Sequence, residues 1–327
     1  MQKVRAIRFS RTGGPEVLNW EEITIGSPGP GNVLVRHTAI GLNYIDTYHR
    51  SGLYPVQSSP SGIGQEAAGV VEAVGEGVTE LKVGDRIAYG TGPIGAYAEA
   101  RSIPAEKVIK IPDGIDDRTA AAMMLKGLTA QYLLRRTYRV KPGDTILVHA
   151  ASGGVGLILC QWAKHLGAAV IGTVGSLEKA QVAQAHGCDH TILYRVENFA
   201  KRVRDLTGGA GVPVVYDGVG KETFAGSLDS LRRLGMMVSY GSASGPVPPV
   251  DIALLNQKGS LFLTRPSLMG YAATRAELEE MANELIDVVA SGKVKIEINQ
   301  TYPLHDAARA HRELEGRKTT GSTVLLP

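Results

Sequence analysis

The sequence predicts an α/β protein in which a β-rich domain is followed by a doubly wound parallel sheet, and three observations support this class. Short β-type runs between glycine and proline signals dominate the chain up to about residue 120. From Thr145, strand-like runs alternate with helical stretches, which requires crossover connections and a parallel sheet with helices on both faces. Between these parts, residues 118–138 repeat apolar side chains at helical spacing, so a connecting helix is expected there.

The first domain is expected to be a twisted, largely antiparallel β structure with little helix. Its strand candidates are VLVRHTAI, GVVEAVG and DRIAYG, and its turns are indicated by GGPEV, SPGPG and VGD. In the alternating part, the predicted strands are TILVHA, AAVIGTV, HTILY, PVVYDGV and GMMVSYG. The predicted helices run through VGLILCQWAKHLG, 177–186, 197–206 and 222–233.

The part after residue 265 is expected to contain two helices and two strands. AELEEMANELIDVVASG predicts an amphipathic helix with Leu278, Met281, Leu285 and Val288 on one stripe. A strand in KIEINQTYPL, a helix around HDAARAHRELEG and a last strand in TGSTVLLP complete the chain.

Composition limits the classes of function. The chain is 43% hydrophobic and 20% charged, which is ample for two cores. Its 35 Lys and Arg against 32 Asp and Glu give a charge of +3, too small to argue for nucleic acid or an anionic membrane. Cys160 and Cys188 form no clustered motif, and the N-terminus resembles no secretory signal, so a cytoplasmic location is expected.

A turn of small residues connects the strand TILVHA to the next helix. Small residues let the chain turn tightly, let its amides approach a pyrophosphate and let the helix pack on the strand. A strict GxGxxG motif would have glycine at Ala151. Because the turn opens the first βαβ unit, we interpret it as the dinucleotide site of a Rossmann domain. Its predicted binding residues are Ser152, Gly153, Gly154, Val155 and Gly156.

The end of the second strand of that unit discriminates between cofactors. An acid there would bind a free ribose hydroxyl and repel a 2′-phosphate. No acid closes this strand, and after Gly175 the chain offers the Ser176 hydroxyl and the Lys179 cation. Glu178 is expected to point to solvent from the first turn of the helix. Lys179 alone could be an ordinary exposed lysine, so these residues leave NADH and NADPH open.

Six motifs are distributed over the whole chain: GLNYIDTYHRSGLYP (41–55), GIGQEAAGVVEAVGEGV (62–78), LKGLTAQYLL (125–134), HAASGGVG (149–156), VVYDGVG (214–220) and RKTTGSTVLLP (317–327). Together they resemble the zinc-free quinone oxidoreductases of the medium-chain dehydrogenase/reductase superfamily. The resemblance implies a GroES-like β-barrel catalytic domain over 1–125 and a Rossmann NADPH-binding domain over 126–265. Residues 266–327 would return to the catalytic domain.

The resemblance also implies the site residues. Relatives hold the 2′-phosphate with residues that correspond to Ser176, Lys179, Tyr194 and Arg317, and two cations with two hydroxyls suit a dianionic phosphate. NADPH is therefore the expected cofactor. The residues implied to lie at the nicotinamide or to line the cleft are Asn43, Tyr48, Tyr54, Thr129, Gly241 and Ser242.

No metal is expected. Zinc-dependent members of the superfamily have a cysteine in the early segment and a histidine in a GHE motif. Asn43 and Gln65 stand in the corresponding stretches here, and neutral amides are poor zinc ligands. The eight histidines form no HExxH motif, and His149 is expected to be a packed strand residue.

The resemblance implies reduction of a small quinone by NADPH, without a need for nucleic acid or a membrane. Two alternatives stay open: NADPH-dependent reduction of an enone or alkenal double bond, and an NADPH-binding sensor or RNA-binding protein with little turnover. Relatives often pair along the last strand of the cofactor sheet. The apolar run GSLFLTRPSL would be an exposed edge there, so a homodimer is expected.

Overall fold

A computed structural model describes all residues from Met1 to Pro327. The chain forms two compact units: unit 1 is Met1–Leu128, Ala272–Ile286 and Ile296–Pro327, and unit 2 is Thr129–Tyr271 and Asp287–Lys295. Two of the limits fall inside the helices α2 (Asp117–Tyr132) and α9 (Arg275–Ala290). The limits that the resemblance implied, after residues 125 and 265, lie within seven residues of the limits of the structure at 128/129 and 271/272.

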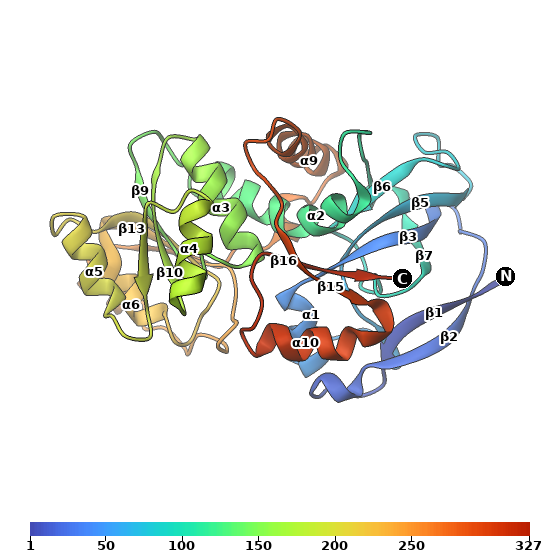
Figure 1. Cartoon of the computed structure of the whole chain (residues 1–327), viewed down its shortest axis with the longest axis horizontal. Coiled ribbons are helices and arrows are strands. Elements are labelled where there is room, and N and C mark those ends of the chain that lie inside the picture. Colours follow the sequence, from blue (N-terminus) through green and yellow to red (C-terminus); the bar gives the residue numbers. More distant parts are fainter. The chain divides into compact units, whose positions relative to one another are not determined.

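Unit 1 is built on two β-sheets (Figure 1). One has the strand order β2-β1-β4, and the seven-stranded sheet has the order β15-β16-β3-β5-β6-β8 with β7 paired to β3. All of these pairings are antiparallel except that of β15 with β16, as expected for a largely antiparallel β domain. The strands are β1 (Gln2–Phe9), β2 (Asn19–Ile25), β3 (Asn32–Leu42), β4 (Ser61–Gly62), β5 (Glu66–Val74), β6 (Arg86–Tyr89), β7 (Ala100–Pro104), β8 (Ile109–Lys110), β15 (Ile298–Pro303) and β16 (Ser322–Leu326).

The C-terminal segment completes the core of unit 1. Tyr302, Leu304 and Leu325 belong to the same buried cluster as Ile7 and Phe9. Strand β16 also pairs with β3, the long central strand of the large sheet. Unit 1 therefore needs the C-terminal residues for both hydrogen bonds and apolar burial. The remaining elements are α1 (Tyr44–Ser51), α10 (Ala307–Glu315), and the 3-10 helices η1 (Pro15–Val17), η2 (Ala105–Lys107) and η4 (Leu304–Asp306).

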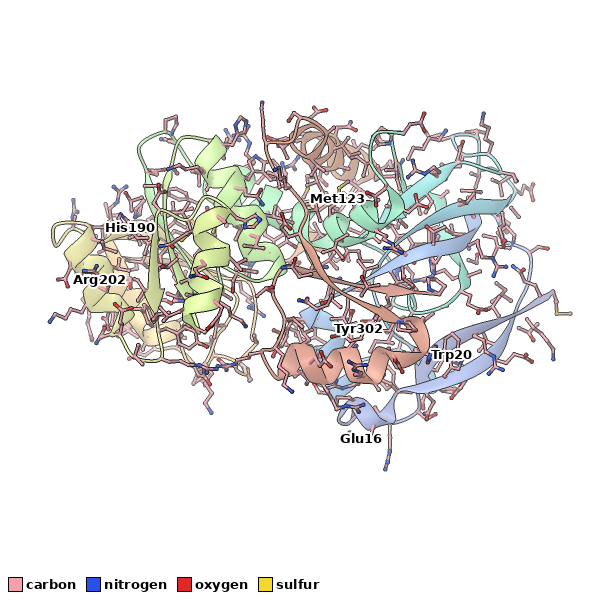
Figure 2. The ribbon with its side chains drawn as sticks, viewed as in Figure 1. Glu16, Trp20, Met123, His190, Arg202 and Tyr302 are labelled. Carbon is pink, nitrogen blue, oxygen red and sulfur yellow. The ribbon has the colours of Figure 1, made fainter.

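The helices α2 and α9 follow their apolar patterns. The α9 stripe predicted from the sequence is confirmed, because Leu278, Met281, Leu285 and Val288 are all buried. Met123, labelled in Figure 2, is fully buried on α2. No helix of the protein combines the length and the apolar composition that crossing a membrane requires.

Unit 2 contains a six-stranded, all-parallel sheet with the strand order β11-β10-β9-β12-β13-β14. Figure 1 labels three of its strands, β9, β10 and β13. This confirms the doubly wound sheet, whose strand order reverses between β9 and β12. The strands are β9 (Thr145–Val148), β10 (Ala169–Val174), β11 (His190–Leu193), β12 (Val212–Asp217), β13 (Leu231–Ser239) and β14 (Phe262–Thr264). The helices are η3 (Leu133–Thr137, a π turn), α3 (Gly154–His165), α4 (Leu177–Ala185), α5 (Phe199–Leu206), α6 (Phe224–Ser230), α7 (Ala253–Gln257) and α8 (Leu268–Tyr271).

The predicted helix over 222–233 is too long. Helix α6 ends at Ser230, and β13 begins at Leu231. Leu231 is fully buried and pairs with Val212, so tertiary packing draws it into the sheet. Leu234, with a φ of 60°, then interrupts the regular strand.

Candidate active site

The small-residue turn after β9 lies in unit 2 at the point where the strand order reverses. Gly153 is the N-cap of α3, whose first backbone N–H groups have no partner within the helix. A Cβ at Gly156 would lie 2.3 Å from the Ala150 carbonyl oxygen and 2.8 Å from the Ala151 carbonyl carbon. The helix can approach the turn this closely only with glycine at 156. A helix N-terminus behind a tight turn fits the pyrophosphate of a dinucleotide.

The ends of β10 and β11 lie side by side in unit 2. A Cβ at Gly175 would be 3.4 Å from Tyr194 Oη and 3.7 Å from Arg195 Nε. Ser176 caps α4 by accepting the Lys179 backbone N–H at 3.3 Å. Gly175, Ser176, Lys179 and Tyr194 are thus brought together, and the exposed Arg195 adds a cation that the sequence analysis missed. A basic residue directly after the predicted strand HTILY was the available signal.

Glu178, which was expected to point to solvent, and Arg317, which was predicted to hold the 2′-phosphate, have distinct surroundings. Glu178 is exposed, as expected, and hydrogen bonding by Ser176 lowers the pKa of its carboxyl, so an ionised acid lies on the same turn. Arg317 belongs to unit 1, where it follows α10 with a φ of 57°. That backbone conformation is uncommon for residues other than glycine.

The loop after β12 is organised by a fully buried carboxylate. Asp217 accepts the backbone N–H groups of Val219 at 2.8 Å and Gly220 at 3.0 Å. The hydroxyls of Thr223 and Ser227 donate to the same carboxylate. Because Asp217 satisfies so many donors, it holds this loop in one conformation.

Arg265 fixes the Gly241–Ser242 turn, which the sequence assigned to the cofactor cleft. Its Nη1 donates to the Ser239 oxygen at 2.9 Å and to the Gly241 oxygen at 2.8 Å. A Cβ at Gly241 would lie 2.4 Å from the Gly218 oxygen, so the turn packs directly on the neighbouring loop. The role of Arg265 depends on tertiary contacts and had no local sequence signal.

His149 is a packed residue, as the sequence analysis expected. It is fully buried just after β9, with its Nδ1 2.8 Å from Thr173 Oγ1 and its Nε2 2.9 Å from Ser227 Oγ. Ser227 gives its hydroxyl proton to Asp217, so His149 Nε2 must donate to Ser227. Burial lowers the pKa of His149. His149 is therefore a neutral imidazole whose two nitrogens are both hydrogen-bonded. It stabilises the loop after β12 and is not available as a catalytic base.

In unit 1, the predicted residue Asn43 lies at the N-terminus of α1 and is 5% exposed. Its Nδ2 donates to Glu66 Oε2 at 2.7 Å, and Lys126 Nζ donates to the same oxygen at 2.8 Å. Glu66 Oε1 accepts the Leu125 backbone N–H at 2.8 Å. Glu66 and Lys126 were not predicted from the sequence as site residues, although each is a charge in an apolar run (QEAAGVV and MMLKGL).

The predicted tyrosines lie in an aromatic cluster around α1. The Tyr48 ring is 5.2 Å from the Tyr54 ring and 5.6 Å from the Tyr44 ring, measured between centroids. The Tyr54 backbone N–H donates to the Tyr48 carbonyl at 3.0 Å. Tyr48 is 8% exposed. Thr129, the other predicted nicotinamide residue, is buried on α2 as the first residue of unit 2.

A second buried network in unit 1 runs from Asp46 to Glu315. Tyr97 Oη donates to Asp46 Oδ2 at 2.9 Å and lies 3.2 Å from His311 Nε2. Arg50 donates to His311 Nδ1 at 3.0 Å and to both oxygens of Glu315. Burial lowers the pKa of His311 to about 3, so its imidazole is neutral at physiological pH. Burial raises the pKa of Asp46 to about 7, and its Oδ1 is buried without a hydrogen-bond partner.

We expect the variant Asp46→Asn to gain stability relative to the unmodified protein as pH rises from about 4 to about 7. In that range the folded Asp46 keeps a proton that the unfolded chain has lost, so the free energy of unfolding falls with pH. Asparagine does not titrate. The difference should grow by up to about 4 kcal/mol, at about 1.4 kcal/mol for each pKa unit. Urea unfolding of both proteins across this pH range measures it.

Comparing the variant with the unmodified protein cancels the contributions of the other titrating groups to the free energy of unfolding. The buried His37 and His311, whose pKa values are lowered to about 4 and about 3, make stability rise with pH in both proteins and cancel in the difference. Parallel stability curves for the two proteins would mean that Asp46 is ionised throughout.

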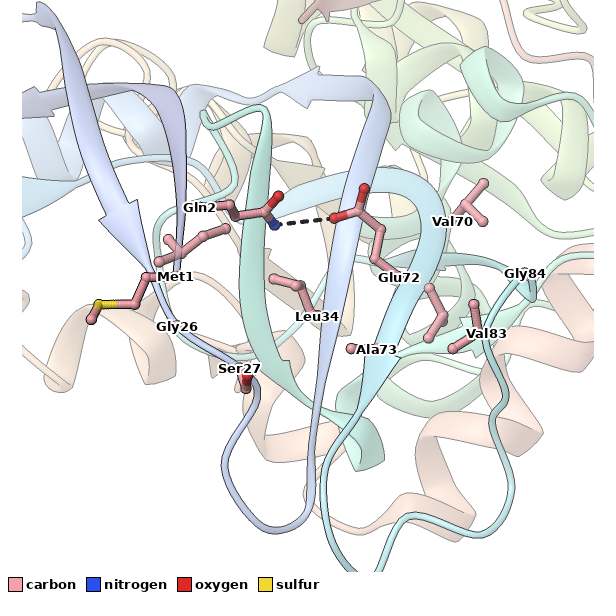
Figure 3. A pocket seen from close by; sticks show the side chains of 12 residues that line it. Met1, Gln2, Gly26, Ser27, Leu34, Val70, Glu72, Ala73, Val83 and Gly84 are labelled. Carbon is pink, nitrogen blue, oxygen red and sulfur yellow. Dashed lines mark hydrogen bonds between the residues drawn. The ribbon is translucent and has the colours of Figure 1, made fainter.

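A surface hollow of about 630 Å³ in unit 1 contains none of the predicted site residues (Figure 3). Leu34, Val70 and Val83 contribute apolar lining, and Gln2 donates to Glu72 at 3.2 Å across it. No group of three or more His, Cys, Asp or Glu side chains in the protein could hold a metal ion. The buried Gln65 stands beside Glu66 where the sequence analysis noted the missing histidine.

Comparisons with known proteins agree with this architecture. The family model described as "Alcohol dehydrogenase GroES-like domain" matches residues 29–113, and that described as "Zinc-binding dehydrogenase" matches residues 154–291. A quinone oxidoreductase of Pseudomonas aeruginosa is 57% identical, with 99% of each chain covered. The structure of Escherichia coli quinone oxidoreductase complexed with NADPH is 52% identical with a TM-score of 0.97, covering 99% of this chain and 100% of that one. A 2-haloacrylate reductase of Burkholderia is 51% identical, with 99% of each chain covered.

A GroES-like β unit joined to a parallel dinucleotide-binding sheet defines the medium-chain dehydrogenase/reductase class. Within that class, the identity over nearly the full length shows that the chain belongs to the quinone oxidoreductase family.

Proposed function

We propose that the protein reduces quinones with NADPH. The observation that carries the proposal is the cluster at the ends of β10 and β11, where Tyr194 and Arg195 lie beside the Ser176–Lys179 turn and no acid closes β10. Such a cluster suits a 2′-phosphate. The family membership and the NADPH complex of the Escherichia coli relative support the same cofactor.

When bound, NADPH supplies the hydride, and the chain has to bind, orient and protect the reactants. The N-terminus of α3 would hold the pyrophosphate, and Ser176, Lys179, Tyr194 and Arg317 would hold the 2′-phosphate. Asn43, Tyr48, Tyr54 and Thr129 would hold the nicotinamide or the acceptor, and the Gly241–Ser242 turn would border the cofactor. A quinone is already electrophilic, so it needs mainly positioning, and solvent can supply the proton that completes the hydroquinone.

Steady-state oxidation of NADPH with a quinone panel and an enone panel tests the proposal. The 2-haloacrylate reductase among the relatives makes double-bond reduction the second candidate, because a haloacrylate is an activated alkene. Higher kcat/KM for quinones supports quinone reduction, and higher values for enones support the alternative. A protein that binds NADPH without oxidising it with any acceptor would be a sensor or RNA-binding protein instead.

The variant Arg317→Ala should bind NADPH roughly ten- to a hundredfold more weakly, while its NADH affinity stays unchanged. A charge-assisted contact to phosphate contributes about 1.5–3 kcal/mol, which corresponds to this range. Arg195→Ala should also weaken the preference for NADPH, because Arg195 lies beside the Ser176–Lys179 turn. Fluorescence titration of the unmodified protein and both variants with NADPH and NADH measures the six affinities. Equal affinity of the unmodified protein for NADPH and NADH would refute the cofactor assignment.

The proposed activity requires no metal. Asn43 donates both side-chain N–H groups within unit 1, and Gln65 offers only a neutral amide in place of imidazole. We therefore expect turnover with quinones to be unchanged after exhaustive chelation. Stoichiometric zinc, with activity lost on its removal and recovered on its return, would contradict this expectation.

We also propose that two copies pair along β14. This strand is the edge of the unit 2 sheet, and Phe262 and Leu263 on it are 57% and 37% exposed. An exposed apolar edge strand favours pairing with a second copy. Sedimentation at micromolar concentration should show a dimer that Phe262→Lys dissociates, and a monomeric unmodified protein would remove this proposal.

A cytoplasmic location is proposed as well. Cys160 and Cys188 are both unpaired and buried, as suits a reducing compartment. Fractionation of the source cells, with the protein followed by immunoblot, tests this assignment.

A further inference from the structure

Ala150, in the turn after β9, has a backbone conformation that the surrounding structure has to enforce. Its φ of 53° lies in the left-handed region, which is costly for a residue with a Cβ. The Gly153 backbone N–H donates to the Ala150 carbonyl oxygen at 2.9 Å, and a Cβ at Gly156 would lie 2.3 Å from the same oxygen. The conformation of Ala150 therefore determines where the N-terminus of α3 begins and which way it faces.

The two neighbours of Ala150 are held by β10 and β12. The His149 backbone N–H donates to the Tyr216 carbonyl oxygen at 3.0 Å, and the Ala151 backbone N–H donates to the Thr173 carbonyl oxygen at 3.1 Å. Thr173 Oγ1 also lies 2.8 Å from His149 Nδ1, and both side chains are buried. Thr173 thus holds one neighbour of Ala150 through its backbone and the other through its side chain.

The hydrogen bonds of the His149 side chain have a single direction, which a buried carboxylate imposes. The carboxylate of Asp217 can only accept, so the Ser227 hydroxyl donates to it at 2.8 Å. Ser227 Oγ then accepts from His149 Nε2 at 2.9 Å, which leaves Nδ1 to accept the Thr173 hydroxyl. The four side chains form one directed chain of hydrogen bonds from β10 to β12, which we call the Thr173–Asp217 chain.

The far end of the Thr173–Asp217 chain fixes the loop after β12. Asp217 accepts two backbone N–H groups of this loop. The loop is joined in turn to the residues after β13, because the Ala243 N–H donates to the Gly218 oxygen at 3.2 Å and the Ser244 N–H to the Val219 oxygen at 2.8 Å. A doubly wound sheet binds its ligand beyond the carboxyl ends of its strands, where the strand order reverses. The chain therefore connects adjacent loops of the ligand-binding edge.

We propose that His149 and Ser227 are positioning residues for cofactor binding, which transmit the order imposed by Asp217 to the turn in front of α3. The inference rests on the proposed function, since it needs a dinucleotide at the N-terminus of α3. The pyrophosphate is bound by backbone N–H groups, whose directions depend on the conformation of the turn. When the chain is broken, Ala150 can leave the left-handed region. Only a fraction of the molecules is then competent to bind, and the apparent affinity falls by that fraction.

The variant Ser227→Ala tests the inference without turnover. It removes the hydroxyl between His149 and Asp217 and leaves the backbone donors to Asp217 in place. We expect NADPH to bind about 3- to 10-fold more weakly in a fluorescence titration, as for a competent fraction of about a third to a tenth. Amide hydrogen exchange of the free protein, measured by NMR, should become faster at Ala151 and Gly153, although both are distant from Ser227 in the sequence.

The variant Thr173→Val breaks the chain at its other end. Valine has nearly the shape of threonine and lacks the hydroxyl, and the carbonyl oxygen that accepts the Ala151 N–H remains. His149 Nδ1 then loses its donor. This variant should also weaken NADPH binding and speed up the exchange of the Ala151 and Gly153 amides.

The matched control is Ser230→Ala, which removes a buried hydroxyl from the same helix. Ser230 donates to the Gly226 carbonyl oxygen at 2.8 Å and takes no part in the chain. This variant should become less stable in urea while its NADPH affinity and the exchange of the turn stay normal. If Ser227→Ala or Thr173→Val behaved in the same way, the chain would be merely structural and the inference would be overturned. Failure of the unmodified protein to bind NADPH would instead refute the proposed function.

Discussion

Replacing Glu315 by alanine should lower the free energy of unfolding by about 3–5 kcal/mol, the range for removing one partner of a buried ion pair. Arg50 is 2% exposed, and its two Nη atoms bond to the two Glu315 oxygens at 2.9 Å and 2.7 Å. Without Glu315, the guanidinium keeps only the neutral acceptors His311 Nδ1 and the Gly13 oxygen. The Glu315 side chain is 33% exposed, so water can enter and the loss should lie at the lower end of the range.

A neighbouring pair on α10 provides the control. Arg309 and Glu313 form an i,i+4 pair with side chains 61% and 31% exposed, so Arg309→Ala should cost less than about 1 kcal/mol. Glu313 also accepts the hydroxyl of Tyr302, labelled in Figure 2, at 2.6 Å, so the variant changes Arg309 and not Glu313. Urea unfolding of both variants gives the comparison. If the two variants lost the same free energy of unfolding, Glu315 would not be needed to stabilise the buried Arg50 charge.

The fold could be predicted where one element carries its own periodic signal. The stripe of Leu278, Met281 and Leu285 predicted α9, and the alternation after Thr145 predicted the parallel sheet. Helix α1 had no such signal, because its eight residues are too few to repeat an apolar pattern. Its aromatic contacts are local: Tyr48 packs on Tyr44 in the same helix and on Tyr54 in the following turn. Its ends are set locally instead, by Asn43 and Asp46 at the start and by Gly52, with a φ of 85°, at the end.

The site divides in the same way. The glycine turn and the Ser176–Lys179 cap are contiguous in sequence, so a local motif could reveal them. The Asn43, Glu66 and Lys126 contacts join three distant segments, and only the fold brings them together. A charge in an apolar run indicates that a buried partner exists, because an unpaired buried charge is too costly, but it does not identify the partner.

Replacing Gly156 by alanine should weaken NADPH binding by about a hundredfold or more and also destabilise unit 2. The added Cβ would lie 2.3 Å from the Ala150 oxygen and 2.8 Å from the Ala151 carbonyl carbon. These are backbone atoms of a turn that already has Ala150 at a φ of 53°, so the first turn of α3 must move away. Overpacking of this kind costs about 1–3 kcal/mol, and the displaced helix N-terminus no longer presents its N–H groups to the pyrophosphate.

The turn has glycine for two reasons: close packing of α3 on the backbone at Gly156, and close approach of the backbone to phosphate at Gly153. The variant Gly153→Ala tests the second reason alone. Gly153 has a φ of −82° and a ψ of 173°, which alanine adopts readily, and its Cβ would approach only the Ala150 oxygen, at 3.2 Å. We therefore expect nearly normal thermal unfolding for Gly153→Ala and a selective loss of NADPH affinity, because the methyl group stands where the backbone approaches phosphate. Gly156→Ala should lose both properties. If fluorescence titration shows that Gly156→Ala binds NADPH as tightly as the unmodified protein, the pyrophosphate does not lie at the N-terminus of α3.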